Sequence, residues 1–266
     1  MDSENKNTKY KKYLLKFYIF VFMYIFMALF ILYLTFRVNN ITVSSVFMRN
    51  NIFLNASANE TDKTNENAAK SGKPVIIIDA GHGGTDGGAV GADNILEKEI
   101  NLSIALKLKR LFKMANCEVI LTRETDIMLN DDGVKKRKAS DLSNRVKIAN
   151  KYPDAIFISI HMNKFPQEQS KGMQIFFSEN NLDSANLAEL LKKNNRAYLH
   201  PENNREIKRG KNIFVLENIK NIGILVECGF LSNYEEAHML TTDDYQNKLA
   251  KIIFASVVEF ERKFGN

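Results

Sequence analysis

The stretch VIIIDAGHGGTDGGAVG, at residues 75–91, joins a short apolar run to a loop crowded with glycine. Val and Ile in a short continuous run are typical of a buried strand in a parallel sheet. The run ends in Asp79, and His82 follows three residues later as one of only 4 histidines in the chain. Because ligands gather at the carboxyl ends of strands in α/β sheets, His82 stands where a functional group is expected.

The glycine-rich loop could serve as a phosphate loop, because glycines let backbone N–H groups approach an anion. However, it lacks both the Gly-Lys-Ser/Thr ending and the G-x-G-x-x-G spacing, and helical periodicity begins only near residue 95. We therefore favour a turn-rich loop that holds His82 in a special backbone conformation and leaves open space beside it.

Outward from this stretch, short runs rich in Val and Ile alternate with longer amphipathic segments. Strands are predicted at 75–79, 118–121, 155–160, 172–177, 212–216 and 223–227. Helices are predicted at 97–115, 140–150, 182–199 and 245–264, where apolar residues recur at helical spacing. This alternation predicts a single α/β domain at 74–266 whose sheet is largely covered by helices.

The N-terminal quarter contains a 20-residue stretch without charge, at residues 17–36. A helix of that length spans about 30 Å, the thickness of a bilayer hydrocarbon core. Five lysines precede it within residues 1–16, so the positive-inside rule predicts a cytoplasmic tail, a transmembrane anchor at 17–36 and an extracytoplasmic remainder. A cleaved signal peptide is the alternative, but the apolar stretch exceeds the usual length of about 7–15 residues.

The segment at 37–73 is rich in Asn, Ala, Thr and charged residues without an apolar period, which predicts a flexible linker. Residues 1–73 hold 10 basic and 5 acidic side chains, whereas residues 74–266 hold 27 and 26. The formal net charge of +6 therefore belongs mainly to the N-terminal quarter. A body this close to neutral argues against nucleic acid as a partner.

Two further strands carry polar groups at their ends. His161 directly follows the strand at 155–160, and Glu227 breaks the apolar run at 223–227. Two imidazoles and a carboxylate at such positions can share one crevice. Two neutral imidazoles plus one carboxylate, with a fourth position left to water, form the ligand pattern of catalytic zinc. Such a site also needs a group that takes the proton of the water, and Glu227 suits that role.

Glu97 opens the helix predicted at 97–115 and has two interpretations. Within Asn94-Ile-Leu-Glu97 it could close a capping box, as the Glu at N3 that reaches back to the N-cap. It also shares the inward stripe of Asn101 and Ile104, where a carboxylate needs a compensating partner such as a metal ion. The spacing alone leaves both interpretations open.

Four motifs resemble those of the zinc-dependent N-acetylmuramoyl-L-alanine amidases. They are residues 75–91, EKEINL at 97–102, SIHMN at 159–163 and VECGFLSN at 226–233. The resemblance covers essentially all of residues 74–264, in the family's order and spacing. It implies one Zn²⁺ held by His82, Glu97 and His161, with Glu227 as the catalytic residue. It also implies a twisted, mostly parallel sheet of about six strands flanked by helices, in a single catalytic domain.

The resemblance implies hydrolysis of the amide bond between the lactyl group of N-acetylmuramic acid and L-alanine in peptidoglycan. Within the family, the germination-specific amidases of the spore cortex are most similar, on RKASDLSNRVKIAN at 137–150 and on the single N-terminal apolar segment. That subgroup acts at the first step toward muramic-δ-lactam, and an activating accessory protein would be a further partner. A vegetative cell-wall amidase and a non-catalytic wall-binding module are the alternatives. Asn163 is a candidate substrate contact or, alternatively, stabilises a turn.

Overall fold

The computed structural model describes residues 22–24, 26–27, 30 and 73–265. The chain divides into two units, Met1–Ala69 and Lys70–Asn266, and the fold below is that of the second unit. Within the described residues, no helix combines the length and apolar character needed to cross a membrane. The tail, the anchor and the linker predicted at 1–16, 17–36 and 37–73 lie almost entirely outside the described residues, so these three assignments stay predictions.

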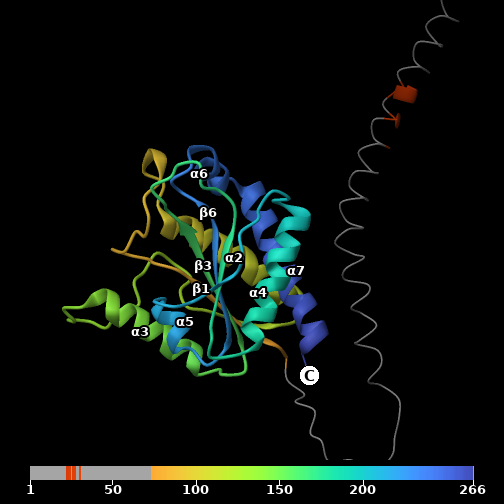
Figure 1. Cartoon of the computed structure of the whole chain (residues 1–266). Helices are drawn as coiled ribbons and strands as arrows, with labels where there is room; N and C mark the ends of the chain where they lie inside the picture. The colour runs from red at the N-terminus through yellow and green to blue at the C-terminus, as the bar shows by residue number, and fades with distance from the viewer. Residues whose placement is uncertain (1–21, 25, 28–29, 31–72, 266) are drawn as a thin grey trace, which may run out of the picture. The chain divides into compact units, whose positions relative to one another are not determined.

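A six-stranded sheet in the order β2-β1-β3-β6-β4-β5 forms the centre of the domain (Figure 1). Its strands are β1 Val75–Ala80, β2 Glu118–Leu121, β3 Ile156–Asn163, β4 Gln174–Phe177, β5 Lys208–Arg209 and β6 Ile222–Phe230. The first four strands in this order pair in parallel, whereas β4 runs antiparallel to β6 and parallel to β5. The prediction of a mostly parallel sheet of six strands is confirmed.

Helices cover both faces of the sheet. The larger core packs α2 Glu97–Met114, α4 Asp183–Tyr198 and α7 Asp243–Phe264 on one face. The smaller core packs α3 Arg137–Asn150 and α5 Phe214–Asn218 on the other face. The short helices η1 Ala92–Asn94 and α6 Tyr234–Thr241 follow β1 and β6. The four helices expected from apolar periodicity are all present, and α3 begins three residues earlier than predicted.

Strand alternation decides on which face the predicted site opens. Ile158 and Ile160 of β3 belong to the larger core, whereas Phe157 belongs to the smaller one. Since successive side chains of a strand point to opposite faces, His161 points to the same face as Phe157. In β6 the register pairs Glu227 with His161. Both groups therefore lie on the face that α3 and α5 cover.

The strand predicted at 212–216 is wrong, because this segment forms α5 Phe214–Asn218. Val215 and Leu216 are buried against the sheet, as they would be in a strand. A short apolar run does not separate a buried strand from a buried helix, so periodicity could not decide here. The Glu217 side chain accepts a hydrogen bond from the backbone N–H of Asn212 at 2.8 Å, which stabilises the turn into the helix.

Leu108→Ala tests the larger core. Leu108 is fully buried on α2, so we expect the free energy of unfolding to fall by about 2–5 kcal/mol through lost apolar burial and a residual cavity. Met114→Ala on the same helix is the control, because this side chain is 64% exposed and its loss should cost at most about 0.5 kcal/mol. Urea unfolding followed by circular dichroism measures both, and equal losses would contradict the assignment of the core.

Candidate metal centre

Two buried arginines hold the loop that follows β1. Arg123 donates hydrogen bonds from Nε to the carbonyl oxygen of Ala80 at 2.9 Å and from Nη2 to that of Gly81 at 3.0 Å. Arg145 donates from Nη1 to the carbonyl oxygen of Ala80 at 2.8 Å and from Nη2 to that of His82 at 2.7 Å. Three consecutive carbonyl groups at the end of β1 are thus bound by guanidinium groups.

Acidic side chains compensate the buried charge of Arg145. Its Nη1 lies 2.6 Å from Asp79 Oδ1 and its Nε lies 2.8 Å from Asp141 Oδ2. Burial alone would lower the pKa of Arg145, but the charges of Asp79 and Asp141 outweigh burial and raise it. Burial likewise would raise the pKa of Asp79, but Arg145 and a hydrogen bond from Ser159 hold that pKa below its usual value. The ion pairs therefore stay charged inside the fold.

His82 adopts a positive backbone φ of 60°. This conformation costs a residue other than glycine about 1–3 kcal/mol and persists only where the surroundings impose it. The hydrogen bond from Arg145 to the carbonyl oxygen of His82 supplies part of that constraint. The special backbone conformation predicted for His82 is confirmed.

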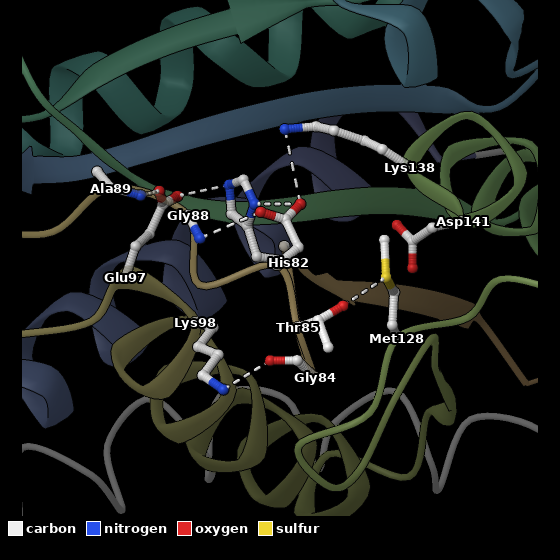
Figure 2. Close-up of polar contacts among 12 residues, drawn as sticks. His82, Gly84, Thr85, Gly88, Ala89, Glu97, Lys98, Met128, Lys138 and Asp141 are labelled. Atoms are coloured by element: carbon white, nitrogen blue, oxygen red, sulfur yellow. Dashed lines mark hydrogen bonds and ion pairs between the residues drawn. The ribbon is translucent and has the colours of Figure 1, made fainter. Parts of the chain in front are cut away.

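The structure brings His82, Glu97 and His161 together from three elements: the loop after β1, the first turn of α2 and the end of β3. One potential ligand atom from each lies within 4.8 Å of the others. Glu97 Oε1 lies 2.9 Å from His161 Nδ1 and 3.3 Å from His82 Nε2, and Figure 2 shows the Glu97 side chain directed at the His82 ring. This cluster could hold a metal ion.

Glu97 does not close a capping box, so that interpretation is wrong. The N-cap of α2 is Leu96, and Asn94 belongs to η1. The Glu97 carboxylate instead accepts hydrogen bonds from the backbone N–H of Ala89 at 2.7 Å and of Met162 at 3.0 Å. Those bonds orient a side chain that is only 3% exposed and direct it at the two imidazoles.

The charges of the cluster suit a cation. Burial alone would raise the pKa of Glu97, but hydrogen bonds from His161 and His82 and their charges hold it well below its usual range. Burial alone would lower the pKa of His82, but Glu97 and Asp86 outweigh burial and raise it. An ionised carboxylate between two imidazoles attracts a positive charge, and a divalent metal ion would take the place of the imidazole protons there, because it binds neutral imidazole.

Two glycines allow the ligand side chains to lie directly against the backbone of the loop. A Cβ at Gly88, whose φ is +70°, would lie 2.5 Å from Glu97 Oε2 and 2.8 Å from His82 Cδ2. A Cβ at Gly81 would lie 2.3 Å from His161 Nε2. The glycines therefore let the backbone approach the three side chains closely, and these side chains fill the space that a Cβ would occupy.

Glu227 stands beside the cluster with an unpaired oxygen. Its Oε2 is buried and has no hydrogen-bond partner among the described residues. Burial, the largest cause, raises the pKa of Glu227 to about 7, and the charge of Glu97 acts in the same direction. An unpaired buried carboxylate with a shifted pKa is a mark of a functional site, because a purely structural group would be satisfied.

Two other polar residues stand close in sequence to the candidate ligands. Asn163 ends β3 after a register shift from His161, and its carbonyl oxygen accepts a hydrogen bond from the backbone N–H of Leu231 at 2.7 Å. The role of its side chain stays a prediction.

Asp86, which the sequence did not single out, lies with Oδ2 2.9 Å from His82 Nδ1. The buried ion pair of Asp141 and Arg145 was likewise not predicted from the sequence. Their spacing of four residues in a helix was a signal that could have identified it.

A cavity of about 100 Å³ adjoins the two histidines, between the sheet and the helices α3 and α5. Lys138 and Leu142 of α3 line one side, and Phe214 of α5 lines the other. This hollow has both apolar and cationic walls and reaches His82 and His161 of the cluster.

Known proteins match the domain closely. Residues 76–259 match the model of the Amidase_3 family, N-acetylmuramoyl-L-alanine amidase. The chain belongs to this family, which makes it a hydrolase with N-acetylmuramoyl-L-alanine amidase activity on peptidoglycan.

Individual relatives agree with the family. The germination-specific N-acetylmuramoyl-L-alanine amidase of Bacillus subtilis is 36% identical over 199 residues, which cover 74% of this chain and 83% of the relative. The structure of the CwlD amidase of Clostridioides difficile, solved in complex with the GerS lipoprotein, is also 36% identical, with a TM-score of 0.69. It covers 72% of this chain and 100% of that chain. The catalytic domain of CwlV from Paenibacillus polymyxa is 32% identical, with a TM-score of 0.60 over 71% of this chain and 98% of that one.

Arg145→Met tests the arginine clamp on the loop after β1. The substitution leaves Asp79 and Asp141 as unpaired buried charges, so we expect the free energy of unfolding to fall by about 3–5 kcal/mol. Lys147→Met on the same helix is the control, because Lys147 is exposed and its loss should change stability by at most about 0.5 kcal/mol. Chemical denaturation measures both, and similar values for the two variants would refute the clamp.

Glu227→Gln tests the raised pKa of Glu227 in chelator-treated protein. The folded state holds the proton up to about pH 7, whereas the unfolded carboxyl releases it near 4.5. This contribution to stability is therefore present below pH 4.5 and is lost as the pH rises to 7. Allowing for partial solvent access, wild type should lose about 1–2 kcal/mol more between pH 5 and pH 8 than Glu227→Gln does. Parallel pH profiles of unfolding would contradict this.

Proposed function

We propose that this chain is a zinc-dependent amidase that cleaves the bond between the lactyl group of N-acetylmuramic acid and L-alanine in the peptidoglycan of the spore cortex. One observation carries the proposal: His82, Glu97 and His161 converge within 4.8 Å, next to the unpaired carboxylate oxygen of Glu227. Similarity to the germination-specific amidase of Bacillus subtilis supports the cortex as the site of action.

The donor atoms of the cluster fit zinc. Two imidazole nitrogens and one carboxylate oxygen make three protein ligands, which is the set that catalytic zinc takes when its fourth position is left to water. When bound, Zn²⁺ supplies a Lewis acid that polarises the scissile carbonyl and makes water acidic enough to react near neutral pH.

Glu227 would move the proton. With a pKa of about 7, its carboxylate can accept a proton from the attacking water and later release it to the departing alanine nitrogen, and a pKa near the working pH favours both transfers. The register of β3 and β6 holds Glu227 beside His161, so the base is fixed relative to the ligands by the sheet itself. Asn163, farther along β3, would contact the substrate beyond His161.

The proposal also includes a membrane anchor and an accessory partner. Residues 17–36 would anchor the chain in the membrane with residues 1–16 in the cytoplasm, because the apolar stretch is long and its lysines lie on the N-terminal side. The domain at 74–266 would then act outside the membrane, on the first step toward muramic-δ-lactam.

The CwlD amidase was solved in complex with the GerS lipoprotein, which supports an accessory lipoprotein as an activating partner here.

Digestion of peptidoglycan tests the proposed reaction. Incubation of the detergent-solubilised full chain with Zn²⁺ and cortex peptidoglycan should release peptides with a free N-terminal alanine, as identified by mass spectrometry. Glu227→Gln should lower the rate by about 10²–10⁴-fold because the proton transfer is lost. Chelation should abolish release and added Zn²⁺ should restore it.

Glu235→Gln is the matched control, because Glu235 is exposed on α6 and should retain the wild-type rate. Intact strands after digestion with wild type plus the accessory lipoprotein would contradict the reaction. Equal rates on cortex and vegetative peptidoglycan would contradict the cortex assignment alone.

A further inference from the structure

Asp86 contacts His82 on the side that faces away from the metal cluster. His82 Nε2 faces Glu97 Oε1, whereas its Nδ1 lies 2.9 Å from Asp86 Oδ2. The second oxygen, Oδ1, accepts a hydrogen bond from the backbone N–H of Gly88 at 3.2 Å. Paired backbone hydrogen bonds of 2.9 and 3.0 Å between Gly83 and Asp86 hold the residue in place. The carboxylate is therefore fixed before any metal binds.

The contact suits a His82 ring that binds a metal ion through Nε2. An ionised carboxylate only accepts hydrogen bonds, so Asp86, at 2.9 Å, favours a proton on Nδ1. Nε2, which faces Glu97, is then the nitrogen left for a metal ion once its own proton leaves. Since Nδ1 has no aligned hydrogen-bond partner among the described residues, Asp86 acts on the ring through the charge of this close contact. We propose that Asp86 is a positioning residue that selects this tautomer of His82 and fixes the ring for binding a divalent metal. The inference rests on the proposed metal site.

Lys138 is the other group near this carboxylate. Its Nζ lies 3.6 Å from Asp86 Oδ2, and the side chain is 66% exposed. Figure 2 shows Lys138 and Glu97 on opposite sides of the His82 ring. Since 3.6 Å exceeds hydrogen-bond distance, His82 is the nearer partner of this oxygen and Lys138 acts on it only through its charge.

Asp126, in the loop after β2, offers a comparison because it contacts the same glycine-rich loop. Its Oδ1 accepts a hydrogen bond from the backbone N–H of Gly84 at 2.8 Å, and its Oδ2 accepts one from Lys98 Nζ at 2.7 Å. Asp126 thus supports the glycine-rich loop as Asp86 does, but its hydrogen bonds go to Gly84 and Lys98 instead of His82. A purely structural role would make the two aspartates equivalent, whereas tautomer selection would not.

Zinc affinity separates these roles. The full chain in detergent, stripped with a chelator, is titrated with Zn²⁺ against a chromogenic competitor, and circular dichroism confirms that each variant is folded. We expect Asp86→Ala to weaken zinc binding by about 10–100-fold. Asp86→Asn should be no milder, because its amide must turn N–H groups either toward Nδ1 of His82, which selects the wrong tautomer, or toward the N–H of Gly88. Asp126→Asn should stay within about twofold of wild type.

The possible outcomes distinguish failure of this inference from failure of the proposed function. Wild-type affinity in Asp86→Asn, or an equal loss in Asp126→Asn, overturns the inference while the metal site stands. A wild-type chain that does not bind Zn²⁺ overturns the proposed function itself. Loss in both Asp86 variants with retention in Asp126→Asn establishes Asp86 as the residue that positions His82.

Discussion

The hydrogen bonds from two buried guanidinium groups to the carbonyl oxygens of Ala80, Gly81 and His82 are the constraint on which the site depends. A buried arginine is costly unless opposite charges and acceptors surround it. Asp79 and Asp141 supply those charges to Arg145. The end of β1, the placement of α3 and the positive φ of His82 are therefore coupled, since each requires the others.

The two carboxylates of the site differ in their surroundings and therefore in their chemistry. Glu97 accepts hydrogen bonds from two backbone N–H groups and faces two imidazoles, so its pKa is low and it stays ionised. Glu227 is buried without a partner for Oε2, so its pKa rises to about 7. Environments that push two pKa values apart separate the roles of ligand and proton carrier. In the proposed mechanism the same residue type thus serves two functions within one site.

Most of the fold could be predicted because its signals are local. The strands 75–79 and 118–121 and the helix 97–115 follow from runs and stripes of apolar residues, and the structure places them within one residue of their predicted ends. The strand predicted at 212–216 was wrong, because a run of four apolar residues can be buried in a strand or in one turn of helix. The capping box at Glu97 failed because contacts with Ala89 and Met162, remote in sequence or in another element, compete with a local bond and win.

The sequence by itself determined the α/β class, the family and the placement of His82 and His161 at strand ends, since alternation of strands and helices brings the carboxyl ends of parallel strands to one edge. Only the tertiary structure decided how the ligands are held. The bond from Arg145 to the carbonyl oxygen of His82 joins residues 63 positions apart, and no local pattern encodes a partner at that distance. The raised pKa of Glu227 likewise comes from burial, which exists only once the domain has folded around it.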